Sequence, residues 1–145
     1  MPSDPYNLTR FVQAQENAYA TALRELQNGH KRSHWMWFIF PQIQGLGFSP
    51  TAQYYAVKDI EEARAYLAHP LLGPRLTECT ATVNALEGKS LGQILGHVDH
   101  LKFRSSMTIF ELAAGANSEF SKALDKYCSG ERDRATLDIA GASGR

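Results

Sequence analysis

The sequence has few cysteines and no long apolar run, and both absences limit what this protein can be. Its two cysteines, Cys79 and Cys128, lie far apart, and neither has a second Cys or His at the spacing of a metal site, so we predict no metal ion. No P-loop, complete dinucleotide fingerprint or nucleophile elbow can be traced, and we therefore expect no cofactor. The longest strongly apolar stretch, residues 35–40, is far shorter than the roughly 20 residues that cross a bilayer.

An excess of charge of either sign is also missing. The 15 Lys and Arg residues balance the 15 Asp and Glu residues, which gives a formal net charge of zero. Proteins that bind nucleic acid nonspecifically normally carry a basic excess on one face, so this balance argues against such a partner. The first residues lack the basic and apolar regions of a secretion signal, and we expect a soluble cytoplasmic protein with no membrane segment.

Helix signals are abundant along the chain. Capping residues at Ser49, Asp59 and Ser90 precede apolar stripes of helical period, and Gly or Pro residues end those stripes. One long amphipathic helix is expected over residues 5–27, with Asp4 as its cap, and another over residues 99–114. Helices alone explain nearly every apolar pattern in the sequence.

The architecture expected from these signals is all-α. We predict a single multihelical domain of about seven or eight helices over residues 4–137, followed by a loose tail over residues 138–145. Residues 35–40 show no polar alternation, so their pattern fits either a short buried helix or a buried strand, and the helix is favoured.

The segment from Lys31 to Gln42 sets bases, an imidazole and two tryptophans against the most apolar residues present. Burial of so many aromatic atoms stabilises a fold at about 25 cal/mol per Å², whereas desolvation penalises the charges placed beside them. This contrast marks a candidate pocket. Its candidate ligand-binding residues are Lys31, Arg32, Ser33, Trp35, Trp37 and Gln42, and His34 is the candidate proton carrier.

A second polar group stands in the helix expected over residues 99–114. On a helical wheel, Asp99, Lys102, Ser105 and Ser106 fall between two apolar arcs, where polar groups must be satisfied internally or line a wet cavity. In a structural interpretation, Asp99 caps the helix and pairs with Lys102, and the two serines bond to helix carbonyls. In a functional interpretation, this arc faces the Lys31 to Gln42 segment and converges with it on an anion.

Two hypotheses for function follow, and they belong to different classes. In the first, the protein is an enzyme or a binder for a small anionic ligand, with nucleotides as one class of candidate. Lys31, Arg32 and Lys102 would hold charge, a tryptophan would stack on a ring, and Asp99 would orient His34. In the second, the aromatic segment 35–40 anchors a protein partner or a homodimer without catalysis.

The sequence also resembles a bacterial family, domain-of-unknown-function family eighteen-ten, through several long motifs. The matching stretches are Asp4-Pro5-Tyr6-x-Leu8-x-Arg10-Phe11-Val12-x-Ala14-Gln15, Lys31 to Gln42, Gly45-Leu46-Gly47-x-Ser49, Tyr55-Ala56-Val57, Glu62-Ala63-x-Ala65-Tyr66-Leu67-x-His69-Pro70-x-Leu72-Gly73-x-Arg75-Leu76, and Asp99-x-x-Lys102-x-x-Ser105-Ser106-Met107-Thr108-x-Phe110. The resemblance implies a multihelical single domain and brings no established activity. Members are often called calpastatin, but that calpain inhibitor is largely disordered, whereas this chain is rich in aromatics and helical stripes.

Overall fold

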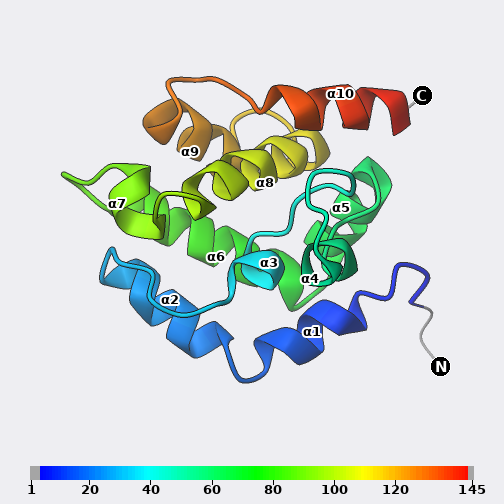
Figure 1. The fold of residues 1–145 in the computed structure, drawn as a ribbon, viewed down its shortest axis with the longest axis horizontal. Helices are drawn as coiled ribbons and strands as arrows, with labels where there is room; N and C mark the ends of the chain where they lie inside the picture. Colours follow the sequence, from blue (N-terminus) through cyan, green and yellow to red (C-terminus); the bar gives the residue numbers. More distant parts are fainter. Residues whose placement is uncertain (1–3, 144–145) are drawn as a thin grey trace.

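The computed structural model describes residues 4–143, without the side chains of residues 142 and 143. Within this range the fold is all-helical and contains no strand, although Ile43 and Val57 form one isolated parallel bridge. The helices are α1 (Thr9–Gln15), α2 (Tyr19–Gln27), α3 (Met36–Ile39), α4 (Pro50–Tyr54), α5 (Ile60–Ala68), α6 (Leu72–Ala85), α7 (Leu91–Leu95), α8 (Asp99–Ala114), α9 (Glu119–Tyr127) and α10 (Arg134–Ser143) (Figure 1). None of these helices is long and apolar enough to cross a membrane.

The predicted class is confirmed, but the number of helices is ten among the described residues rather than seven or eight. One reason is that the helix expected over residues 5–27 is broken. The chain turns after Gln15, whose side-chain amide donates to the Phe38 carbonyl at 2.8 Å and to the Tyr66 hydroxyl at 3.2 Å. The turn allows α1 to pack on α3 while α2 packs on α6 (Figure 1).

The other reason is α10. The sequence predicts a loose tail from residue 138, yet the chain is helical as far as Ser143, and α10 packs on α8. Its buried residues are Thr136 and Ala140, which give a weak apolar signal because one is polar and the other is small. The prediction for residues 138–143 is therefore wrong, and residues 144 and 145 lie outside the described range.

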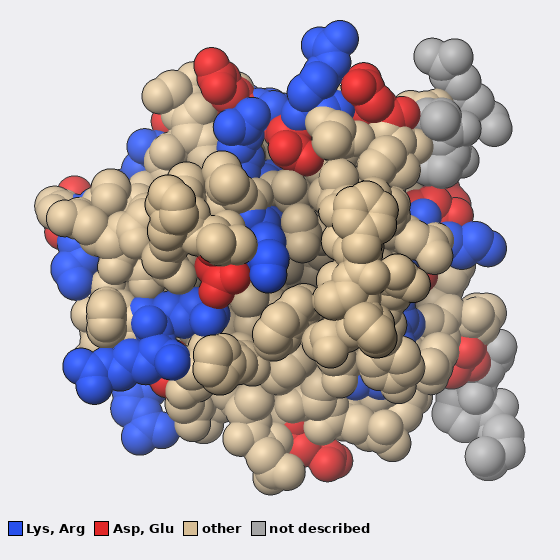
Figure 2. All heavy atoms as spheres, in the orientation of Figure 1, with Lys and Arg blue, Asp and Glu red and all other residues tan. Residues whose placement is uncertain are grey.

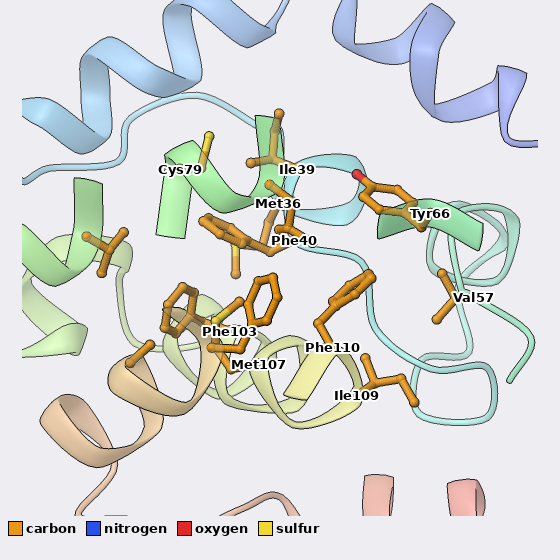
Figure 3. Close-up of a cluster of buried hydrophobic side chains, with 14 of the residues drawn as sticks. Met36, Ile39, Phe40, Val57, Tyr66, Cys79, Phe103, Met107, Ile109 and Phe110 are labelled. Carbon is orange, nitrogen blue, oxygen red and sulfur yellow. The ribbon is translucent and has the colours of Figure 1, made fainter. Parts of the chain in front are cut away.

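Helix α8 lies at the centre of the molecule, where it packs against α5, α7, α9 and α10 (Figure 1). Phe103, Met107 and Phe110 of α8 point into the buried cluster drawn in Figure 3. Phe40, at the end of α3, meets Phe103 edge to face with ring centroids 4.9 Å apart. This contact fixes the segment around α3 against α8, and so brings the two polar constellations of the sequence to one side of the fold.

Candidate functional site

The two constellations meet at a cluster of three charged side chains, which we call the lysine–aspartate cluster: Lys31, Asp99 and Lys102. The Asp99 carboxylate bridges the two lysines, with Oδ2 at 2.9 Å from Lys31 Nζ and Oδ1 at 3.6 Å from Lys102 Nζ. Asp99 is the first residue of α8, and Val98 occupies the N-cap position, so the capping role expected for Asp99 is wrong. Its expected pairing with Lys102 is confirmed.

Each lysine of the cluster also lies over an indole ring. Lys31 Nζ is 5.2 Å from the ring centroid of Trp35, and Lys102 Nζ is 5.2 Å from that of Trp37. The Lys31 side chain is only 9% exposed, whereas that of Lys102 is 28% exposed. Figure 2 shows basic and acidic side chains gathered over the start of α8 and beside a hollow in this face. The more loosely held cation is therefore the more accessible one.

Glu25, near the end of α2, holds the loop that presents Lys31. Its carboxylate accepts hydrogen bonds from the backbone N–H groups of Arg32 (2.8 Å) and Ser33 (2.9 Å), from Ser33 Oγ (2.6 Å) and from Trp35 Nε1 (2.9 Å). Burial alone would raise the pKa of Glu25, but these bonds outweigh it and lower the pKa to about 2. The sequence analysis did not identify Glu25, because the pattern of an amphipathic helix does not show which later residues an acidic side chain will bind.

Other predicted site residues of this loop are used differently. Arg32 and His34 are exposed, and no hydrogen bond or ion pair of either side chain occurs within residues 4–143. The Ser33 hydroxyl is engaged by Glu25. Gln42 accepts a backbone hydrogen bond from the segment after α4 through its carbonyl. Trp35 is 1% exposed and belongs to the core, so Trp37 is the tryptophan that reaches the surface.

Ser105 and Ser106 are both buried in α8. The Ser105 hydroxyl donates to the Leu101 carbonyl at 3.2 Å, which matches the structural interpretation of this residue. Ser106 is fully buried, and its Oγ has no hydrogen-bond partner among the described residues. Neither hydroxyl is presented to solvent beside the cluster. Over the same part of the chain, no group of three or more His, Cys, Asp or Glu side chains could hold a metal ion.

An aromatic groove adjoins the cluster on the side of α3 and α4. It is an open depression of about 590 Å³, lined by Trp37, Phe38, Pro50, Thr51, Tyr54 and Tyr55. The rings of Tyr54 and Tyr55 pack edge to face at 4.8 Å, and Tyr55 also packs on Phe38 at 5.4 Å. Apart from Trp37, the predicted site contained none of these residues. The two adjacent tyrosines, Tyr54 and Tyr55, were the feature of the sequence that could have indicated the groove.

Comparison with known proteins identifies the family. The family described as "Protein of unknown function (DUF1810)" matches residues 5–140. The chain belongs to the DUF1810 family. The crystal structure of the conserved hypothetical protein Rv1873 from Mycobacterium tuberculosis resembles this DUF1810 chain with a TM-score of 0.93 and 51% identity, over 95% of this chain and 99% of that one. A comparison with curated proteins gives no match. The family predicted from the motifs is therefore confirmed, and it brings a fold without an assigned activity.

Proposed function

We propose that this protein binds a small anionic ligand at the lysine–aspartate cluster. The observation that carries the proposal is that one carboxylate, Asp99, stands between two ammonium groups, so the cluster keeps one uncompensated positive charge. That charge lies beside a hollow in the surface of a chain whose formal net charge is zero (Figure 2). A local positive charge at a concave, partly desolvated place favours an anion more than the same charge on an open surface.

Lys102 is the residue that we assign to the ligand. Its distance of 3.6 Å from Asp99 is longer than an ideal charge-assisted hydrogen bond, whereas the 2.9 Å contact of Lys31 is close to one. Lys31 would hold Asp99, and Asp99 would keep Lys102 over the face of Trp37. The proposal covers binding and no reaction, since His34, the predicted proton carrier, has no hydrogen bond to Asp99 among the described contacts.

The alternative function, docking of a partner through residues 35–40, has less support. Trp35, Met36, Ile39 and Phe40 are each no more than 2% exposed, so four of the six side chains are committed to the core. An interface anchor has to be accessible before the partner arrives. The burial pattern therefore favours a structural role for most of this segment.

The test compares two matched variants, Lys102→Met and Lys31→Met, with Lys58→Met as the control. Lys58 is exposed, and its carboxylate contact is made by its backbone N–H rather than by its ammonium group. Titration calorimetry with adenosine 5′-monophosphate and ribose 5-phosphate would measure affinity, and thermal unfolding would measure stability. A ligand at about 100 times its Kd should stabilise the wild type by about 2.7 kcal/mol.

We expect Lys102→Met to weaken binding by about tenfold or more while the melting temperature changes little. Lys31→Met should lower both, because it leaves Asp99 without its closer partner. The control should change neither. Unchanged affinity in Lys102→Met, or failure of both phosphates to bind or to raise the melting temperature of the wild type, would contradict the proposal.

A further inference from the structure

We infer that the aromatic groove is a second part of the same site and binds the planar ring of the ligand. This inference rests on the proposed function and narrows the ligand class to an aromatic ring joined to an anionic group, such as a mononucleotide. The lysine–aspartate cluster would take the anionic end, and the face between Trp37 and Tyr54 would take the ring.

Trp37 joins the two parts of the site. Lys102 lies over its ring at 5.2 Å, and the same residue lines the groove with Tyr54 and Tyr55. In Figure 2, an uncharged surface over α3 and α4 borders the charged side chains at the start of α8. One sugar joins base and phosphate in a mononucleotide, so a single ligand can reach both parts at once.

The backbone of the groove around Tyr54 is held in place by Arg10. Arg10, which is 8% exposed, donates from Nε to the Tyr54 carbonyl at 2.7 Å and from Nη2 to the Ala56 carbonyl at 2.8 Å. Its guanidinium also pairs with the buried Glu62 carboxylate at 2.8 Å. Arg10 is thus a positioning residue, and the backbone that carries Tyr54 is fixed before a ligand arrives. Preorganisation of this kind reduces the ordering cost of binding.

The lining suits a flat ring better than an aliphatic or sugar group. Tyr54 is 54% exposed although it is aromatic, and its neighbour Tyr55 packs edge to face on Tyr54 and in a tilted arrangement on Phe38. Exposed aromatic faces next to a cation are the arrangement that stacks on bases, which all have a π-face. Thr51 is the lining residue that carries a hydroxyl on an aliphatic side chain, which could serve the polar edge of a ring. A long polyanion is disfavoured, because the charge of the whole chain is balanced.

The experiment compares three probes on the full chain by titration calorimetry: adenosine 5′-monophosphate, ribose 5-phosphate and adenosine. The variant is Tyr54→Ala, which should fold because the side chain is exposed, and the control is Phe48→Ala. Phe48 is 83% exposed, precedes α4 and does not line the groove. Stacking contributes about tenfold or more per base when measured by alanine substitution.

We expect the mononucleotide to bind about tenfold or more tighter than ribose 5-phosphate, and Tyr54→Ala to remove this difference without changing the affinity for ribose 5-phosphate. Equal affinity for the two phosphates, or no effect of Tyr54→Ala, would overturn the ring subsite while the anion site stands. Adenosine binding that depends on Tyr54, with no gain from phosphate and no effect of Lys102→Met, would instead overturn the anion site. The absence of binding by all three probes would overturn both.

Discussion

The hydrogen bonds that Glu25 accepts offer the sharpest test of how the site is built. Replacing Glu25 by Gln keeps the size of the side chain but removes its charge and one acceptor oxygen. With its oxygen in the place of Oε1, the amide can still accept from the N–H groups of Arg32 and Ser33 and from Trp35 Nε1. Its NH₂ group then replaces Oε2, the oxygen that accepts from Ser33 Oγ. The loop before α3 should therefore be held less tightly.

The magnitude follows from the pKa of Glu25. Lowering it from the ordinary 4.5 to about 2 corresponds to roughly 3 kcal/mol of folding free energy. Because Glu25 is only partly buried, solvent screening reduces this figure, and we expect about 1–2 kcal/mol. The folded-state pKa is the lower one, so this stabilisation is fully present above pH 4.5 and is lost as the pH falls towards 2.

Urea unfolding of wild type and Glu25→Gln, followed by circular dichroism, would measure the difference at several pH values. It should be about 1–2 kcal/mol near neutral pH and should shrink steadily below about pH 4.5. Glu16→Gln is the matched control, since Glu16 is exposed and the substitution removes one negative charge, as Glu25→Gln does. A difference that stays constant between about pH 7 and pH 3, or that the control reproduces, would refute the assignment of Glu25 as the anchor of this loop.

Two further predictions concern the core and can be checked by thermal unfolding. Gly73→Ala should destabilise by more than about 3 kcal/mol, because a Cβ at position 73 would lie 2.0 Å from the carbonyl oxygen of Leu67. Gly141→Ala, whose Cβ would have no atom of the described residues within 4 Å, should gain about 0.5–1 kcal/mol of helix propensity. Similar effects of the two substitutions would contradict the close packing of α5 on α6. Trp35→Ala should cost about 3–5 kcal/mol, because the side chain is 1% exposed, and Trp37→Ala should cost clearly less. The reverse order would place Trp37 in the core.

Several signals that act within one helix were read correctly from the sequence. The helix expected over residues 99–114 is α8, Asp99–Ala114, and it stops before Gly115, whose φ of 97° suits glycine. Ser90 and Gln93 form the capping box that their spacing indicates. These features depend on contacts between residues three or four positions apart, and such contacts can be recognised without knowledge of the fold.

Polar contacts between distant segments could not be read in the same way. Asp59 caps α5 as its position in the sequence indicates, since it accepts from the Glu62 N–H. The Glu62 carboxylate completes no capping box with Asp59 among the described contacts. It accepts from the Lys58 N–H and from Arg10, which lies 52 positions earlier in the chain. Nothing in the local pattern marks Arg10 as buried. The break after Gln15 has the same origin, because its side chain binds residues from two other helices.

The site shows the same division. Lys31, Asp99, Lys102 and Trp37 were predicted as parts of one site, and the fold brings them together. Asp99 and Lys102 share a face because they lie three positions apart on α8, whereas Lys31 stands in the loop that Glu25 holds. The exposed positions of Arg32 and His34 depend on the path of a loop that Glu25 determines through bonds invisible in the sequence pattern.

The structural and functional accounts of Lys102 are compatible, because Asp99 has two lysine partners rather than one. Lys31 alone, at 2.9 Å and 9% exposed, provides the tighter compensation of the carboxylate. The second pair, at 3.6 Å and 28% exposed, is of the kind that contributes at most about 1 kcal/mol, and repulsion between the two ammonium groups subtracts from that. Stability therefore gives little reason for Lys102 to stand over the ring of Trp37 beside a hollow. Binding of an anion gives a better reason, since the anion would compensate the positive charge that Asp99 alone does not neutralise. Because Lys102 contributes little to stability, a change of affinity in Lys102→Met would report on binding rather than on folding.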